Sequence, residues 1–174
     1  DQIRRVQKLL EPKTYFLSHD EIRVANWCDS CRREGRSAGQ LLAENMRQCV
    51  ATLHNVNSSA KLCVWSDMFD PHHNAHGNYF LVDGDFTGSW QHVPKDLVMA
   101  VWGAKPREKS LRFFVGQGFP TLVACYYDAN DLNQVKGWLQ LARQVPNVRG
   151  FMYTPWQKKY SLLPAFGDLL REER

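Results

Sequence analysis

The stretch TYFLSHDE, residues 14–21, decides the fold. Its first half is an uninterrupted run of apolar and β-prone residues, which is typical of a strand that is buried on both faces of a parallel sheet. Its second half ends in His19, Asp20 and Glu21 and contains no glycine. Because a phosphate-binding loop after a first strand needs glycines and avoids acidic side chains, the sequence excludes a phosphate cradle at this position.

A helical pattern lies on each side of this predicted strand. The apolar residues of positions 1–11 recur at helical spacing, and Pro12 follows them. Beyond the strand, Ser37 is a plausible N-cap for a second helix. That helix is predicted to bury one apolar face, formed by Leu42, Met46, Cys49, Val50 and Leu53.

The rest of the chain continues the alternation of strand and helix. Further strands are predicted at residues 61–65, 97–102, 121–126 and 149–153, and further helices at 110–115, 132–143 and 162–170. Residues 67–95 form a long polar and aromatic connection with little helical periodicity. Such alternation predicts right-handed βαβ units and a parallel sheet, in one domain over residues 1–174. Five strands could also form an open flavodoxin-like sheet.

Composition narrows the classes of partner. The chain has 174 residues, 44% of them hydrophobic, and a net charge of only +4. The basic residues are scattered and form no stripe for phosphate groups, so nucleic acid is not an expected partner. No apolar run approaches the ~20 residues of a membrane span, and no signal-peptide pattern opens the sequence. The compartment is therefore left open.

The five cysteines form an odd set, which excludes a complete disulfide framework. Cys63 and Cys125 lie in apolar strand-like runs and are expected to be small core residues. Cys28 and Cys31 are the only close pair, and no second pair at zinc-ribbon spacing accompanies them. We expect reduced or structural cysteines, with a redox or metal role for Cys28 and Cys31 as the alternative.

Aromatic and acidic side chains gather where the predicted strands end, which is where parallel α/β folds place their function. The strand ends read His19-Asp20-Glu21, Trp65-Ser66-Asp67, Trp102-Gly103, Tyr126-Tyr127-Asp128 and Tyr153-Thr154-Pro155-Trp156. Aromatic faces pack on the apolar side of a pyranose ring, and carboxylates accept hydrogen bonds from its hydroxyls. The pattern predicts a carbohydrate site.

These motifs occur in the order that family 20 glycoside hydrolases show. Residues 14–21 resemble the fourth barrel strand of that family, which ends in a catalytic Asp-Glu pair, and the similarity extends from about residue 12 to 157. The resemblance implies a parallel (β/α)8 TIM-type barrel, of which this chain supplies about the last five βα units, strands four to eight. Strands one to three are then expected upstream or on another chain, and the segment alone should bind sugar weakly.

The resemblance also implies a reaction, the removal of terminal N-acetyl-hexosamine from a glycan by a β-N-acetylhexosaminidase-like, substrate-assisted retaining mechanism. Glu21 would be the general acid and base, and Asp20 would orient the 2-acetamido group of the substrate. No cofactor and no metal are implied. The substrate contacts would come from the strand ends, with Tyr126 on the oxazoline oxygen, Asp67 and Asp128 on ring hydroxyls, Trp102 and Trp156 as walls, and His19 and Trp65 beside them.

Gln157 and the absent half of the barrel favour a second hypothesis, whereas the intact Asp20-Glu21 pair favours the enzyme, and the family pattern is left at two places. The family usually has glycines where this chain has Ser18 and His19, and a glutamate just after its last-strand tryptophan, where this chain has Gln157. A catalytically silent carbohydrate-binding or regulatory protein on the same scaffold is the alternative.

One cluster of residues is dense enough to suggest a metal site, and it comprises Asp67, Asp70, His72, His73 and His76. Adjacent histidines rarely point the same way, so a polar active-site loop is the favoured interpretation of this cluster.

Overall fold

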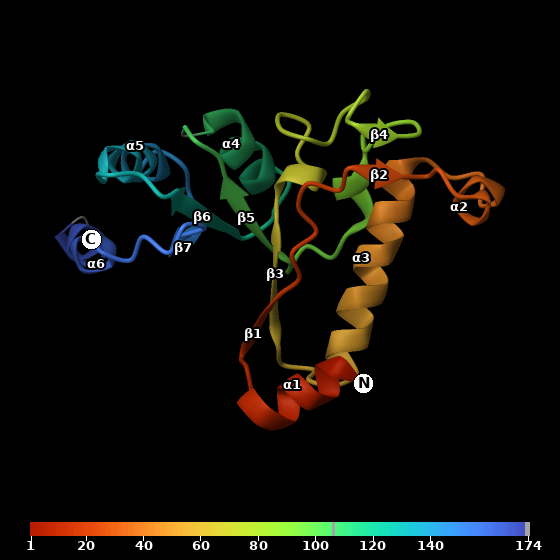
Figure 1. Cartoon of the computed structure of the whole chain (residues 1–174), viewed down its shortest axis with the longest axis horizontal. Helices are drawn as coiled ribbons and strands as arrows, with labels where there is room; N and C mark the ends of the chain where they lie inside the picture. Colours follow the sequence, from red (N-terminus) through yellow and green to blue (C-terminus); the bar gives the residue numbers. More distant parts are fainter. Residues whose placement is uncertain (106, 173–174) are drawn as a thin grey trace. The chain divides into compact units, whose positions relative to one another are not determined.

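The computed structural model describes residues 1–105 and 107–172 (Figure 1). The chain forms two compact units, residues 1–99 and 100–174. The single domain expected over residues 1–174 stays a prediction. None of the described helices is both long enough and apolar enough to cross a membrane.

The strands of the larger sheet follow one another in chain order, which is β1 (Thr14–Phe16), β3 (Lys61–Trp65), β5 (Val98–Trp102), β6 (Thr121–Tyr126) and β7 (Val148–Tyr153). The chain therefore has a parallel α/β fold with all five predicted strands, within one residue of their predicted bounds. Strand β1 pairs with β3, and β6 pairs with β7, in parallel register. A flavodoxin-like sheet reverses its order at a switch point, whereas successive βα units of a barrel do not. The strand order thus contradicts the flavodoxin-like alternative.

In the first unit, the helix predicted after Ser37 is α3 (Ala38–His54). It begins with a capping box, because the Ser37 hydroxyl accepts from the Gln40 amide while the Gln40 side chain accepts from the Ser37 amide. The predicted apolar face is buried except for the partly exposed Cys49. Helix α1 (Gln2–Leu10) buries none of its residues and lies near the end of α3, where Asn57 donates to Gln7 at 3.1 Å (Figure 1).

The connection predicted at residues 67–95 contains short elements that the sequence did not reveal. Strand β4 (Leu81–Val82) pairs with β2 (Val24–Ala25), and two turns of 3-10 helix, η1 (Asp67–Phe69) and η2 (Ser89–His92), flank it. The short helix α2 (Asp29–Arg33) was also missed. Gly39 opens α3 against this connection. A Cβ at Gly39 would lie 2.6 Å from the Thr87 carbonyl oxygen, so only glycine fits without a shift.

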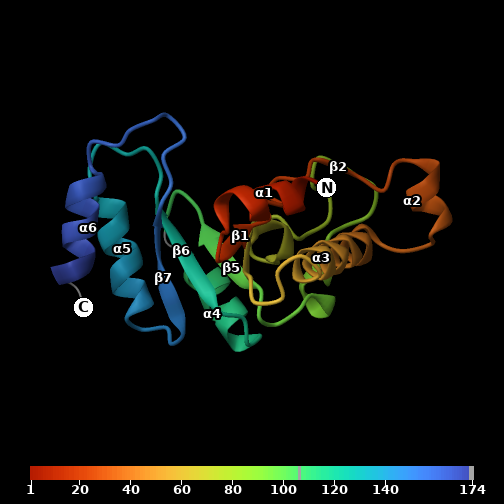
Figure 2. The ribbon, with the colours of Figure 1, turned by 90° about the horizontal axis from the view of Figure 1, so that it is seen from below.

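The second unit contains the three helices predicted after residue 100, which are α4 (Glu108–Gly116), α5 (Asn133–Ala142) and α6 (Leu163–Glu172). Figure 2 shows α5 and α6 side by side, next to β7. Helix α5 buries Val135, Trp138 and Leu139, as its periodicity predicts. Phe166 of α6 packs edge-on against Tyr153 of β7, with ring centroids 5.2 Å apart.

Candidate active site

The backbone around the predicted catalytic pair is left-handed at several residues. The φ angles of Ser18, His19 and Glu21 are 57°, 64° and 44°. Glycine adopts this region freely, whereas another residue pays about 1 kcal/mol or more for it. The two positions where the family usually has glycines therefore adopt the conformation that glycine favours. This departure in sequence is accommodated by strain at a candidate functional site.

Asp67 holds the loop after β1. Its Oδ2 accepts hydrogen bonds from the Glu21 backbone amide at 2.9 Å and from the Asn74 side chain at 2.8 Å, and the residue is fully buried. The Trp65 amide also donates to the Ser18 carbonyl at 3.1 Å. The end of β3 thus fixes the position of Glu21. The expected contact of Asp67 with a sugar hydroxyl stays a prediction, while its role in positioning Glu21 is visible in the structure.

The two carboxylates of the pair have different surroundings. Arg23 donates to Glu21 Oε2 at 3.0 Å, and its guanidinium lies 4.5 Å from the centroid of the Phe80 ring. Both side chains of this ion pair are about half exposed, so the pair contributes little to stability. Asp20 is half-buried, and no hydrogen bond or ion pair to its carboxylate occurs within residues 1–105 and 107–172. Its oxygens are therefore available to a ligand.

Tyr79 completes this cluster. The side chain is 7% exposed, and burial raises the pKa of Tyr79, with the negative charges of Asp67, Glu21 and Asp20 adding to the shift. Its hydroxyl therefore lies within the electrostatic reach of three carboxylates. Sequence reasoning missed Tyr79, because it lies in a connection without periodicity. Arg23 was also missed, because the left-handed backbone at Glu21 follows no strand periodicity from which their contact could be predicted.

His19 and Trp65, both predicted as substrate contacts, make contacts inside the first unit. The Nδ1 atom of His19 lies 2.6 Å from the Leu17 carbonyl oxygen, and Nε2 lies 2.9 Å from Asn45 Oδ1. Since a carbonyl only accepts, Nδ1 carries a proton. Trp65 is 8% exposed and packs edge-on against Phe16, with ring centroids 4.8 Å apart. Their predicted part in substrate binding is not tested by these contacts.

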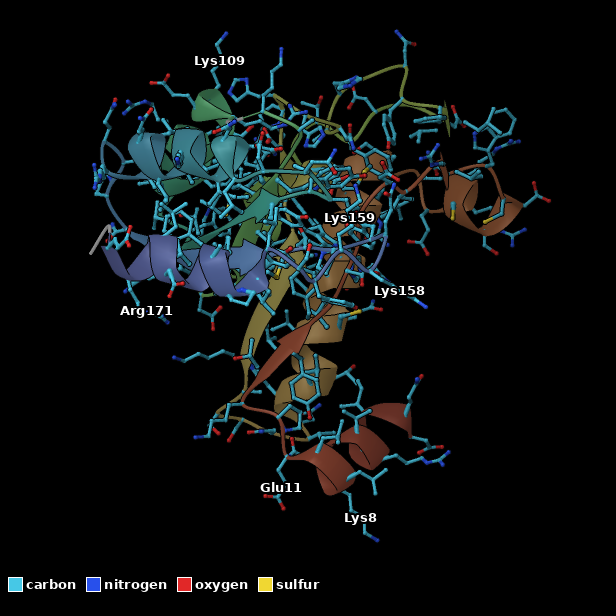
Figure 3. The ribbon with its side chains drawn as sticks, turned by 60° about the vertical axis from the view of Figure 1, so that its left-hand side comes forward. Lys8, Glu11, Lys109, Lys158, Lys159 and Arg171 are labelled. Carbon is cyan, nitrogen blue, oxygen red and sulfur yellow. The ribbon has the colours of Figure 1, made fainter. Side chains whose placement is uncertain are left out.

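In the second unit, Asp128 connects the loops that follow β6 and β7. Its Oδ2 accepts from the backbone amides of Trp156 at 2.8 Å and Gln157 at 3.1 Å, and its carbonyl accepts from Lys159 Nζ at 2.8 Å. The neighbouring Lys158 extends away from this loop (Figure 3). Asp128 Oδ1 is buried and has no hydrogen-bond partner within the described residues. A buried acceptor without a partner is uncommon and marks a position where a ligand hydroxyl could bind.

The other predicted residues of this unit differ in exposure. Trp156 is 60% exposed and Trp102 is half-buried at the end of β5. Tyr126 is buried, donates its hydroxyl to the Ala129 carbonyl at 2.9 Å, and stacks on Tyr153 with centroids 3.9 Å apart. Burial raises the pKa of Tyr126 to about 12, and the contact with Tyr153 is the second cause of this shift. The expected contact between Tyr126 and an oxazoline oxygen stays a prediction.

The histidine-rich segment lies in the connection after β3. Asp70 Oδ1 accepts from the His72 backbone amide at 2.8 Å, which shapes a tight turn. In the described parts of the chain, no three His, Cys, Asp or Glu side chains come together in a group that could hold a metal ion. The interpretation of this segment as a polar active-site loop stays a prediction.

Sequence and structure comparisons give different results. No known family profile matches the chain, and no curated protein matches it significantly. The structure is similar to that of a family 20 exo-β-N-acetylglucosaminidase from Vibrio harveyi, solved as an inactive aspartate-to-alanine mutant, with a TM-score of 0.53 and 13% sequence identity. The match covers 91% of this chain and 26% of that enzyme, so the chain spans about a quarter of its length. At this identity, the likeness shows that the two proteins share a fold over the matched part.

Proposed function

We propose that this chain is part of a glycoside hydrolase that removes terminal N-acetyl-hexosamine residues with Asp20 and Glu21 as its catalytic pair. The observation that carries the proposal is the segment after β1. There, an Asp20 carboxylate without a hydrogen-bond or ion-pair partner among the described residues adjoins Glu21, whose amide donates to Asp67 at 2.9 Å. The segment ends a strand of a fold shared with part of a family 20 enzyme. The barrel of eight strands, with this chain as strands four to eight, belongs to the same proposal.

The proposed reaction has two steps and conserves the anomeric configuration. In the first, Glu21 gives its proton to the glycosidic oxygen while the acetamido oxygen of the substrate attacks the anomeric carbon, so the leaving sugar departs and an oxazoline ring forms. Asp20 orients the acetamido N–H and stabilises its developing positive charge. In the second step, Glu21 takes a proton from water, the water oxygen attacks the anomeric carbon, and the oxazoline opens.

Two further side chains of the first unit assist this chemistry. Arg23 can stabilise the carboxylate that Glu21 becomes after it has given up its proton. Tyr79 stays a neutral hydroxyl, because burial and three nearby carboxylates disfavour its anion. Arg23 thus acts on the charge of Glu21, and Tyr79 contributes an uncharged hydroxyl within the electrostatic reach of the pair.

The residues of the second unit enter the proposal through the family resemblance. Asp128 Oδ1, which is buried without a partner in the described residues, would accept a hydrogen bond from a ring hydroxyl. The exposed Trp156 would offer its face to the sugar ring, as would Trp102. Tyr126 would need to exchange its bond to the Ala129 carbonyl for one to the substrate.

Hydrolysis of aryl N-acetyl-β-glucosaminides by the protein that carries this chain tests the proposal. For a substrate with a poor leaving group, Glu21→Gln should lower kcat by about 10²–10⁴-fold and leave sugar binding nearly unchanged, because only the proton donor is lost. Glu34→Gln is the matched control. Glu34 pairs with Arg36 at 2.9 Å, also two residues apart and exposed, and its loss should leave turnover unchanged. Full activity in Glu21→Gln would remove Glu21 from the mechanism.

The catalytically silent carbohydrate-binding protein remains the second candidate, and one observation favours it. Glu21 forms an ion pair with Arg23, and such a pair favours the ionised carboxylate. A glycosidase instead needs the protonated carboxylic acid at the start of its reaction. Binding of N-acetylglucosamine without hydrolysis of any aryl glycoside by the parent protein would decide for this candidate.

A further inference from the structure

The pair Cys28 and Cys31 lies on a segment that both ribbon views show projecting from the rest of the first unit (Figures 1 and 2). Cys28 caps the short helix α2 (Asp29–Arg33), and Cys31 lies within it. Cys28 is exposed and Cys31 partly exposed, so reagents in solution can reach both sulfur atoms. The proposed sugar chemistry uses neither residue.

The local backbone brings the two sulfur atoms together. The Sγ atoms are 3.1 Å apart, and Cys28 Sγ also accepts from the Cys31 backbone amide at 3.4 Å. A disulfide requires an S–S separation of about 2.05 Å. Closing the remaining gap of about 1 Å needs only small side-chain rotations and leaves α2 intact.

The two thiols differ in acidity. The contact with the Cys31 thiol lowers the pKa of Cys28, and the Cys31 backbone amide lowers it further. The same contact raises the pKa of Cys31. Cys28 is therefore favoured as the attacking thiolate, and Cys31 as the thiol that resolves the mixed disulfide.

The remaining cysteines lack this combination of access and acidity. Burial raises the pKa of Cys49, and it raises the pKa of Cys63 and Cys125 to about 12. Cys63 and Cys125 are buried in β3 and β6, as expected of core residues. A structural zinc ion would need four ligands, whereas the described residues around Cys28 and Cys31 assemble no group of three.

We propose that Cys28 and Cys31 form a redox-active dithiol that exchanges with small disulfides of the glutathione type. The Cys28 thiolate attacks one sulfur of the small disulfide, its S–S bond breaks, and one small thiolate leaves. Cys31 then loses its proton to solvent and attacks the Cys28 sulfur, which releases the second small thiol. In total, two protein thiols are oxidised to one disulfide, and one small disulfide is reduced to two thiols. This exchange does not depend on glycosidase activity.

The closed disulfide would also stiffen a loop that leads out of the candidate active site. Residues 24–25 of β2 connect Glu21 to this segment. Asn26 donates to the Asp83 carbonyl at 3.3 Å, and Arg32 lies 3.9 Å from the Asp83 carboxylate. The dithiol therefore lies in a turn whose residues 26 and 32 both contact residue 83, and its oxidation would add a covalent link between residues 28 and 31 inside that turn.

The test treats the protein that carries this chain with oxidised glutathione, alkylates the remaining thiols and digests with trypsin. One tryptic peptide, residues 24–32, contains both Cys28 and Cys31 and no other cysteine. We expect this peptide to escape alkylation and to weigh two hydrogen atoms less than its reduced form, reversibly on treatment with dithiothreitol. Cys49, in the peptide of residues 48–61, should remain free for alkylation in the same sample and serves as the internal reference.

Single variants separate the steps. Cys31→Ser should stop at a mixed disulfide between glutathione and Cys28, and Cys28→Ser should react more slowly than Cys31→Ser. The control Cys49→Ser should oxidise like the parent. Equal modification of Cys28 and Cys49, or a stable mixed disulfide in the parent protein, would overturn the proposal. Protection of both thiols by added Zn²⁺ at an equimolar ratio would overturn it in favour of a metal site.

Discussion

Asp67 and Asp128 occupy equivalent places in the two units and differ in what they leave unpaired. Each follows a strand and accepts hydrogen bonds from the backbone of the neighbouring loop, Asp67 from Glu21 and Asp128 from Trp156 and Gln157. Asp67 is fully buried, whereas Asp128 is half-buried and keeps Oδ1 without a partner in the described residues. The same residue type at a strand end thus serves mainly as a structural anchor in one unit and as an anchor with a spare acceptor in the other.

The largest expected effect is the difference in free energy of unfolding between alanine variants of these two aspartates. Asp67→Ala should lower the free energy of unfolding by about 3 kcal/mol, because it removes a fully buried side chain and leaves the part-buried donors of Glu21 and Asn74 unpaired. Asp128→Ala should cost about 1 kcal/mol, since its donors lie nearer to solvent. Urea denaturation followed by circular dichroism measures both.

An exposed aspartate provides the control for this comparison. Asp29, in the first turn of α2, should lose less than about 0.5 kcal/mol on substitution by alanine. If Asp128→Ala proved as destabilising as Asp67→Ala, the contrast between the two anchors would be wrong.

A pH effect belongs to the buried tyrosine of the second unit. Tyr126 has a pKa of about 12 in the folded chain, whereas an unfolded tyrosine ionises near 10. The folded state therefore keeps a proton that the unfolded state has lost, so the stabilising contribution is complete below pH 10 and disappears as the pH rises through 12. Tyr126→Phe should flatten this fall when stability is measured between pH 9 and 12. The exposed Tyr160 supplies the control, and an unchanged slope in Tyr126→Phe would contradict the assignment.

The smallest expected effect concerns strained backbone in both units. Ser18 has a φ of 57° and Lys158 one of 59°. Ser18→Gly and Lys158→Gly should each raise the free energy of unfolding by about 0.5 kcal/mol, because relief of the left-handed strain exceeds the extra entropy of glycine in the unfolded chain. Ser30→Gly, inside helix α2, should instead destabilise. A loss of stability in all three variants would show that the two left-handed positions are not strained.

Long elements were predictable from the sequence because their apolar residues form continuous runs or recur at helical spacing. The apolar runs of β3 and β6 and the capped, periodic α3 appear where they were expected. Strands β2 and β4 were not predictable, because two residues have no periodicity and form a strand only when Val24 meets Leu81 from a distant part of the chain.

The candidate site shows the same division. Asp20 and Glu21 were predicted from their position at the end of a strand, and the structure places both in the loop that follows β1. Tertiary packing alone determined that Asp67 fixes the Glu21 amide and that Tyr79 joins the carboxylates. Residue type therefore marked the candidate positions, while the contacts of each side chain depended on burial and partners that no local pattern encodes.

The central claim, that Asp20 serves the acetamido group of an N-acetyl-hexosamine, is tested most directly by calorimetric titration with a thiazoline mimic of the oxazoline intermediate. The protein that carries this chain should bind the mimic, and Asp20→Asn should bind it at least about tenfold more weakly, because the charge that stabilises the intermediate is lost. Asp168→Asn, which alters an exposed ion pair with Arg171 in α6, should bind like the parent. Equal affinities of the parent and Asp20→Asn for the mimic would contradict the account.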